Sequence, residues 1–179
     1  ALLDHYDMDQ TVWIGTSMGG MIGMTLAAGP HASRLSSLVV NDIGPEVPQA
    51  AVARIMQYVS KQPVFNTMTD AEIWLRNAYA PFGPASPQFW RRMVRASTRR
   101  TDLGKVTLHY DPNITQQFSP SAGTAFSWAD YATIEVPTHV IRGIQSDVLT
   151  PQTLARMQQE GPKPNVTQIK GCGHAPTLS

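Results

Sequence analysis

The chain has 179 residues, which suits one domain with a buried core. A formal net charge of +1 gives no reason to expect a nucleic acid or an anionic membrane as partner. The single cysteine, Cys172, excludes an intrachain disulfide and a cysteine-rich metal site. No apolar run approaches the roughly 18 residues that cross a bilayer, so we expect no membrane span.

The two ends of the chain suggest missing sequence. The first residues resemble the tail of a helix and include neither an initiator Met nor a signal peptide. The chain stops shortly after His174, without a closing helix. One cysteine fits a reducing compartment. We therefore expect a cytoplasmic protein that is truncated at both termini.

Four short β-branched runs are predicted to be strands. They cover residues 11–14, 38–40, 138–142 and 166–169. Their near-continuous apolar character is typical of strands buried on both faces of a parallel sheet. Helices are expected over residues 18–28 and from Pro151 to Gly161, with Thr150 as N-cap. This alternation favours an α/β fold.

Between the second and third predicted strands, helix patterns replace strand patterns. Apolar residues recur at helical spacing from Val52, Thr69-Asp70-Ala71-Glu72 reads as a capping box, and Ser86-Pro87 starts a further helix. This insertion has the size of a lid. We therefore expect a core over 1–43, a helical cap over 44–133 and the rest of the core over 134–179.

The strongest motif is Gly15-Thr16-Ser17-Met18-Gly19, which follows a predicted strand and opens a predicted helix. G-x-S-x-G in this context is typical of a nucleophile elbow, where a serine stands on a strained turn. We expect both glycines to remove Cβ atoms that would clash in so tight a bend. The Met18 N–H, directly after the nucleophile, is expected to donate to an oxyanion.

A serine nucleophile needs a base and an acid that orients the base. His174 follows the last predicted strand, at the sheet edge where catalytic groups collect in α/β proteins. Asp147 and Asp42 both follow strand ends, and both fit the order serine, acid, histidine. We favour Asp147, because it lies in a long, turn-rich loop before a capped helix. Asp42 is the alternative acid.

Together these motifs resemble bacterial α/β-fold serine hydrolases with a helical cap. The resemblance is carried by segments 12–20, 38–45, 137–147 and 171–176. It implies a partial α/β-hydrolase fold, a mostly parallel sheet remnant with a helical cap insertion. It also implies a triad of Ser17, Asp147 and His174. Such enzymes usually have several strands before the elbow and a loop that gives a second oxyanion donor, and neither precedes Ser17 here.

The expected activity is hydrolysis of an ester or related acyl bond of a small molecule, through an acyl-enzyme and with no cofactor or metal. Carbon–carbon bond hydrolases, lactonases and cofactor-free haloperoxidases share this triad and stay as alternatives, as does a non-catalytic truncated fragment. We expect the isolated chain to be weakly active or inactive. An arginine cluster over 91–100 is interpreted as a solvated helix face. Neither the substrate nor the oligomeric state follows from the sequence.

Overall fold

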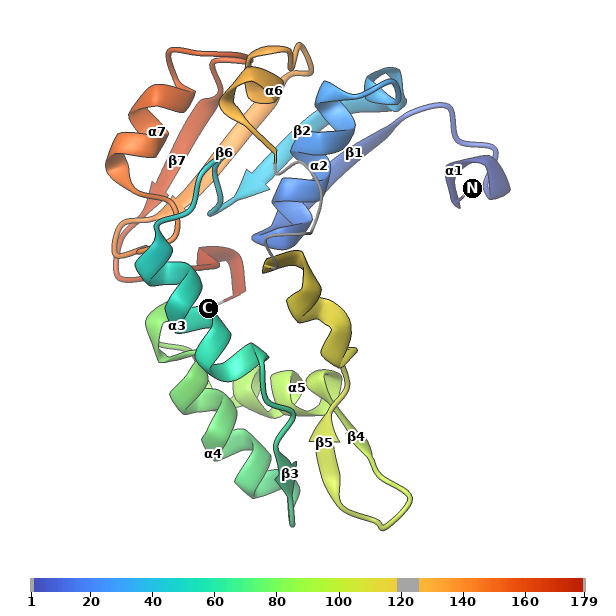
Figure 1. Ribbon diagram of the computed structural model, residues 1–179, viewed down its shortest axis with the longest axis vertical. Helices are drawn as coiled ribbons and strands as arrows, with labels where there is room; N and C mark the ends of the chain where they lie inside the picture. Colours follow the sequence, from blue (N-terminus) through green and yellow to red (C-terminus); the bar gives the residue numbers. More distant parts are fainter. Residues whose placement is uncertain (1, 119–125, 179) are drawn as a thin grey trace. The chain divides into compact units, whose positions relative to one another are not determined.

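The computed structural model describes residues 2–118 and 126–178. These residues form two compact units, which Figure 1 colours along the chain. Residues 2–48 and 126–178 make the first unit, and residues 49–118 belong to the second. The second unit therefore covers fewer residues than the expected cap of 44–133.

The first unit is built on a four-stranded sheet in the order β1-β2-β6-β7 (Figure 1). Each neighbouring pair is parallel, so the predicted α/β class and the four predicted strands are confirmed. Because parallel strands end at one edge, the loops that follow them lie along that edge. The strands are β1 (Thr11–Thr16), β2 (Leu35–Asn41), β6 (Thr138–Gly143) and β7 (Asn165–Ile169).

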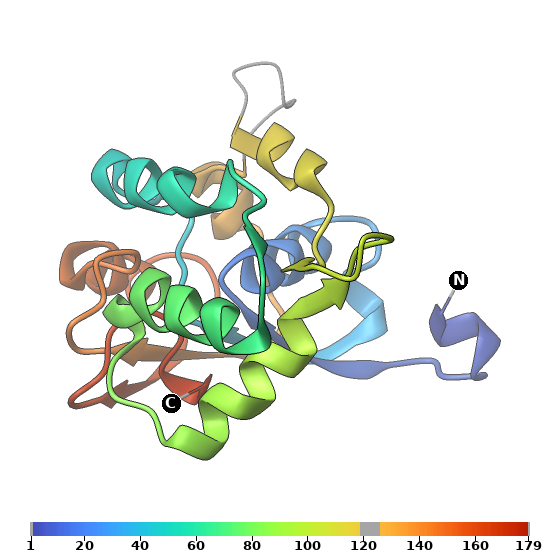
Figure 2. The same cartoon turned by 90° about the horizontal axis from the view of Figure 1, so that it is seen from below.

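Four helices belong to the first unit, and α1 lies beyond the start of β1, apart from the others (Figure 2). The predicted N-cap of α7 is confirmed, since the Thr150 hydroxyl accepts from the Thr153 N–H at 3.0 Å. That helix ends at Met157, before the predicted end at Gly161. The helices are α1 (Leu2–His5), α2 (Met18–Ala28), α6 (Trp128–Ala132) and α7 (Pro151–Met157).

Helix α6 and the segment before residue 49 belong to the first unit because they pack within it. Glu46 accepts a hydrogen bond from Trp128 Nε1 at 2.9 Å and another from Thr153 Oγ1 at 3.2 Å. Tyr131 of α6 is fully buried, and its hydroxyl donates to the Met157 carbonyl at 3.4 Å. These contacts place both segments in the first unit, and the role of the insertion as a cap stays a prediction.

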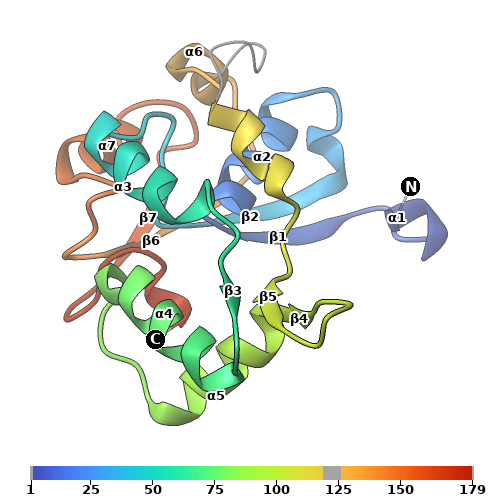
Figure 3. The same cartoon turned by 60° about the horizontal axis from the view of Figure 1, so that its bottom comes forward.

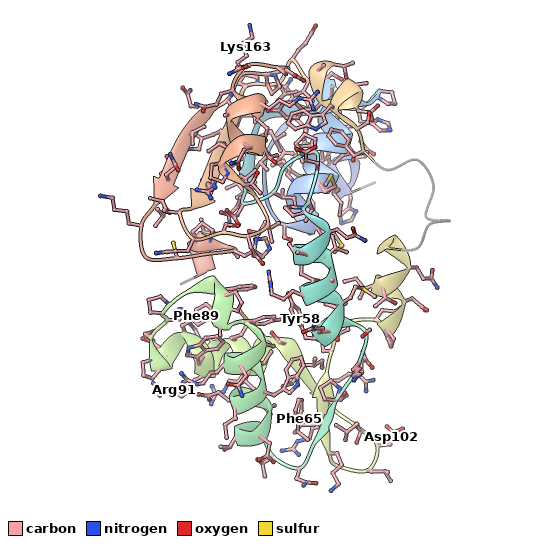
Figure 4. The ribbon with its side chains drawn as sticks, turned by 60° about the vertical axis from the view of Figure 1, so that its left-hand side comes forward. Tyr58, Phe65, Phe89, Arg91, Asp102 and Lys163 are labelled. Carbon is pink, nitrogen blue, oxygen red and sulfur yellow. The ribbon has the colours of Figure 1, made fainter. Side chains whose placement is uncertain are left out.

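The second unit combines three helices with a small antiparallel sheet in the order β3-β5-β4 (Figure 3). The helices are α3 (Gln49–Val59), α4 (Met68–Ala78) and α5 (Pro87–Ser97). The strands are β3 (Val64–Phe65), β4 (Thr98–Arg100) and β5 (Val106–Leu108). Its core contains Phe65 of β3, labelled in Figure 4, together with Leu75, Trp90 and Leu108. None of the helices within residues 2–118 and 126–178 is long and apolar enough to cross a bilayer.

The capping box of helix α4 lies two residues before the predicted one. Its N-cap is Thr67, whose hydroxyl accepts from the Asp70 N–H at 3.1 Å while Asp70 accepts from the Thr67 N–H at 3.0 Å. The predicted box at Thr69 and Glu72 is therefore wrong. Since the helix starts at Met68, Thr69 lies inside the first turn, and Glu72 pairs with Arg76 one turn later at 2.6 Å.

Helix α2 approaches the sheet through glycines. A Cβ on Gly20 would lie 2.5 Å from Ile43 Cγ2, and one on Gly23 would lie 2.5 Å from Trp13 Cδ1. A Cβ on Gly15 would lie 2.1 Å from the Gly19 carbonyl oxygen. A Cβ on Gly19 itself would meet nothing within 4 Å. Of the two motif glycines, only Gly15 is needed for the reason expected from the sequence.

This asymmetry gives a matched pair of substitutions in the full-length protein. Gly15→Ala forces a Cβ against backbone that cannot rotate away, and we expect it to lower the free energy of unfolding by about 3 kcal/mol. Gly19→Ala adds a methyl in open space on a helix, and the free energy of unfolding should stay unchanged or rise by up to about 1 kcal/mol. Urea unfolding measures both, and equal losses would contradict the assignment.

Candidate active site

Ser17 lies on the turn between β1 and α2 with φ 52° and ψ −117°. A positive φ is disfavoured for any residue with a Cβ, so the serine is held under backbone strain. Its N–H donates to the Asn41 carbonyl at 3.0 Å. Its carbonyl accepts from Gly20 N at 2.9 Å and from Met21 N at 3.0 Å. Hydrogen bonds on both sides therefore hold the strained turn, and the serine side chain stays partly exposed.

Met18 is the first residue of α2, directly after Ser17. Backbone N–H groups in the first turn of a helix have no acceptor within that helix, and the helix dipole places partial positive charge there. Both effects suit an amide that receives a developing negative charge. The role of Met18 as an oxyanion donor stays a prediction.

Asp42 directly follows β2, and its side chain is fully buried. Its Oδ1 accepts from the Gly143 N–H at 3.0 Å. Its Oδ2 accepts from the Ser146 hydroxyl and also lies 2.8 Å from His174 Nδ1. A buried carboxylate needs such donors to offset the loss of hydration. The loops after β2, β6 and β7 therefore meet at this one carboxylate.

His174 lies in the loop after β7 with only 4% of its surface exposed. A carboxylate only accepts hydrogen bonds, so Nδ1 carries the hydrogen in its contact with Asp42. In the neutral imidazole Nε2 then carries the lone pair, as a general base requires. This is the tautomer that a serine–histidine pair uses.

The structure brings the alternative acid, Asp42, to His174. Asp147 follows Ser146 in the loop after β6, and its side chain is exposed. The preference for Asp147 rested on loop length before a capped helix, which does not determine which carboxylate reaches the imidazole. The hydrogen bond at His174 Nδ1 favours Asp42, and Ser146 is the residue of the predicted acid loop that reaches it.

Asn41 and Ser146 are site residues that sequence reasoning missed. Asn41 is fully buried, and its Nδ2 donates to Thr16 Oγ1 at 2.9 Å and to Thr177 Oγ1 at 2.6 Å. It thus ties the residue before Ser17 to the segment after His174. A polar residue at the end of a buried strand was the one available clue to Asn41.

Cys172 lies close to this site but lacks the character of a nucleophile. Its side chain is buried. Burial, with a smaller contribution from the negative charge of Asp42, raises the pKa of its thiol. A reactive thiol needs the opposite shift. Within the two described ranges, no three His, Cys, Asp or Glu side chains gather as a metal site would require.

The family comparison matches the whole chain. The alpha/beta hydrolase family covers residues 1–179. A 3-hydroxybutyrate-oligomer hydrolase of Cupriavidus necator is 36% identical over 186 residues, which covers 99% of this chain and 63% of that protein.

Solved structures of related proteins superpose on nearly the whole chain. A protein of Rickettsia typhi superposes with a TM-score of 0.87 at 30% identity, over 99% of this chain and 60% of the other. An alpha/beta hydrolase from Novosphingobium aromaticivorans superposes with a TM-score of 0.84 at 32% identity, over 100% of this chain and 64% of the other. The chain thus spans less than two thirds of the length of these relatives.

The strain at Ser17 can be measured through stability. Ser17→Gly removes the Cβ that makes this backbone conformation unfavourable, so we expect it to be more stable than Ser17→Ala by about 1 kcal/mol. Both variants lack the hydroxyl, so the difference isolates the backbone. The free energy of unfolding of the two full-length variants checks this. A less stable glycine variant would show that flexibility of the unfolded chain outweighs the strain.

Proposed function

Because the chain belongs to the alpha/beta hydrolase family, we propose that it carries the catalytic residues of a serine hydrolase acting on an ester or related acyl bond of a small molecule. The observation that carries the proposal is the buried Asp42–His174 hydrogen bond, made at the same sheet edge as the strained Ser17. Hydrolysis needs a nucleophile, a base and an acid that orients the base. These three residues supply that set.

In the proposed reaction, Ser17 Oγ attacks the carbonyl carbon of the substrate and passes its proton to His174 Nε2. Asp42 stabilises the imidazolium through Nδ1. The Met18 N–H donates to the oxyanion of the tetrahedral intermediate. His174 then protonates the leaving alkoxide, which departs and leaves an acyl-serine. A water molecule, deprotonated by His174, attacks the acyl carbon and releases the acid with Ser17 restored.

An ester is favoured over the other bonds that this triad can break. The Cupriavidus necator relative is named as a hydrolase of 3-hydroxybutyrate oligomers. At 36% identity, that name supports an oxygen ester as the substrate class over a carbon–carbon bond, and it gives no support to haloperoxidase chemistry. We extend the proposal to small esters of hydroxy acids, with the small molecule as partner and no nucleic acid.

A fluorophosphonate probe tests the nucleophile directly. We expect the full-length protein to form a stoichiometric adduct at Ser17, because an activated serine displaces fluoride from the probe and becomes phosphonylated. Ser17→Ala should abolish labelling. Intact-mass spectrometry followed by peptide mapping measures both. A folded wild-type protein that neither labels nor hydrolyses p-nitrophenyl butyrate would refute the proposed function.

Separate substitutions of the two carboxylates identify the acid. Asp42→Asn replaces one carboxylate oxygen with an NH2 donor and removes the negative charge while keeping the shape, and we expect kcat to fall by about 10,000-fold. Asp147→Asn should lower kcat far less, since the Nδ1 hydrogen bond is unchanged. Steady-state hydrolysis of p-nitrophenyl butyrate compares them. The reverse ranking would restore Asp147 as the acid.

A further inference from the structure

We propose that Ser146 is a positioning residue that fixes the catalytic acid, because its hydroxyl donates to the same Asp42 oxygen that faces His174. The inference rests on the proposed function, in which Asp42 orients the base. Ser146 is buried, and it acts through Asp42 rather than through substrate.

The direction of the Ser146 hydroxyl hydrogen follows from its other contacts. Its oxygen accepts from the Val148 N–H at 3.1 Å and from the Leu149 N–H at 3.3 Å. A hydroxyl has one hydrogen to donate and two lone pairs to accept with. Both accepting directions face backbone donors, so the hydrogen is left for Asp42 Oδ2. A residue that only stabilised the turn would need the two backbone contacts and not the third.

Buried Arg142 fixes the loop that presents Ser146. Its Nε donates to the Leu149 carbonyl at 2.6 Å, and Nη2 reaches the Ile144 carbonyl at 3.3 Å. The side chain is 3% exposed, so these bonds form away from water, where they are strong. The guanidinium group thus holds two carbonyls of the loop after β6, one before Ser146 and one after it. These bonds fix the position of Ser146 beside Asp42.

Two donors hold the two oxygens of Asp42. The Gly143 N–H fixes Oδ1 and the Ser146 hydroxyl fixes Oδ2, so the carboxylate plane cannot turn away from the imidazole. The Gly143 donor is backbone and stays when side chains change. Besides His174 itself, Ser146 is the side chain that donates to Oδ2, so its removal leaves that oxygen held by the imidazole alone, and the alignment of His174 depends on it.

Ser146→Ala in the full-length protein tests this. We expect kcat for p-nitrophenyl butyrate to fall by about 10- to 100-fold with KM unchanged within about twofold, the range found when supporting hydrogen bonds around a reactive group are removed. Ser146→Thr keeps the hydroxyl and should recover most of the loss. Ser127→Ala is the matched control, since Ser127 donates to Asp130 at 2.6 Å in a similar serine–carboxylate pair at the start of α6. It should leave kcat unchanged.

A double-substitution cycle separates positioning from general damage. In an Asp42→Asn background, Ser146→Ala should cost nothing further, because its target is gone. The same loss in both backgrounds would overturn the inference, as would a wild-type kcat in Ser146→Ala. If the alanine variant fails to fold, Ser146→Cys keeps the shape with a weaker donor, and a folded Ser146→Cys with full kcat would also overturn it.

A spectroscopic readout does not depend on turnover. The Nδ1–H proton of His174 should give a downfield NMR resonance, and Ser146→Ala should shift it while Ser127→Ala does not. An unchanged resonance would overturn the inference. An active wild type with an insensitive Ser146→Ala refutes this inference alone, whereas an unlabelled, inactive wild type refutes the proposed function beneath it.

Discussion

Asp42 is a carboxylate with no exposed surface, and the rest of the site is arranged around the need to compensate its charge. Removing an ion from water is costly unless hydrogen bonds replace the hydration. Here the replacements come from Gly143, Ser146 and His174, which lie in different parts of the chain. Meeting that need fixes the loops after β6 and β7 relative to β2. The geometry of the candidate site is thus a consequence of satisfying one buried charge.

The neighbouring Asn41 extends the same logic to Ser17. Its backbone carbonyl holds the N–H of Ser17, and its side-chain amide holds Thr16 and Thr177. Two adjacent residues at the end of one central strand therefore connect the elbow, the histidine loop and the loop after β6. Strand β2 can make this connection because it lies between β1 and β6 in the sheet, so the residues at its end are close to the loops after both.

The sequence was sufficient for features that depend on local pattern and insufficient for those that depend on contact. Apolar strand runs and the elbow leave dense local patterns, so β1, α2 and Ser17 could be located. The expected burial on both faces is wrong for β1 and β7, because Val12 and Ile14 of β1 are exposed and most of β7 is exposed. Local pattern favoured Asp147 over Asp42, but it is no sound basis for that choice, because both residues follow strand ends and only packing decides which side chain turns inward. Strands β3 to β5 have two or three residues each, too few for an alternating pattern. The capping box of α4 was predicted two residues too late, because Thr67 with Asp70 and Thr69 with Glu72 both have the spacing of a capping box.

The hydrogen bond between Glu46 and Trp128 has an evolutionary consequence. It joins the segment before residue 49 to helix α6. The chain therefore leaves the first unit and re-enters it at neighbouring points. Domain insertions are tolerated where the ends of the inserted piece lie close together. Evolution can therefore lengthen, shorten or exchange residues 49–118 without moving a strand of the parallel sheet. The candidate site residues Ser17, Asp42 and His174 all lie outside this stretch, so they can be inherited unchanged while it varies.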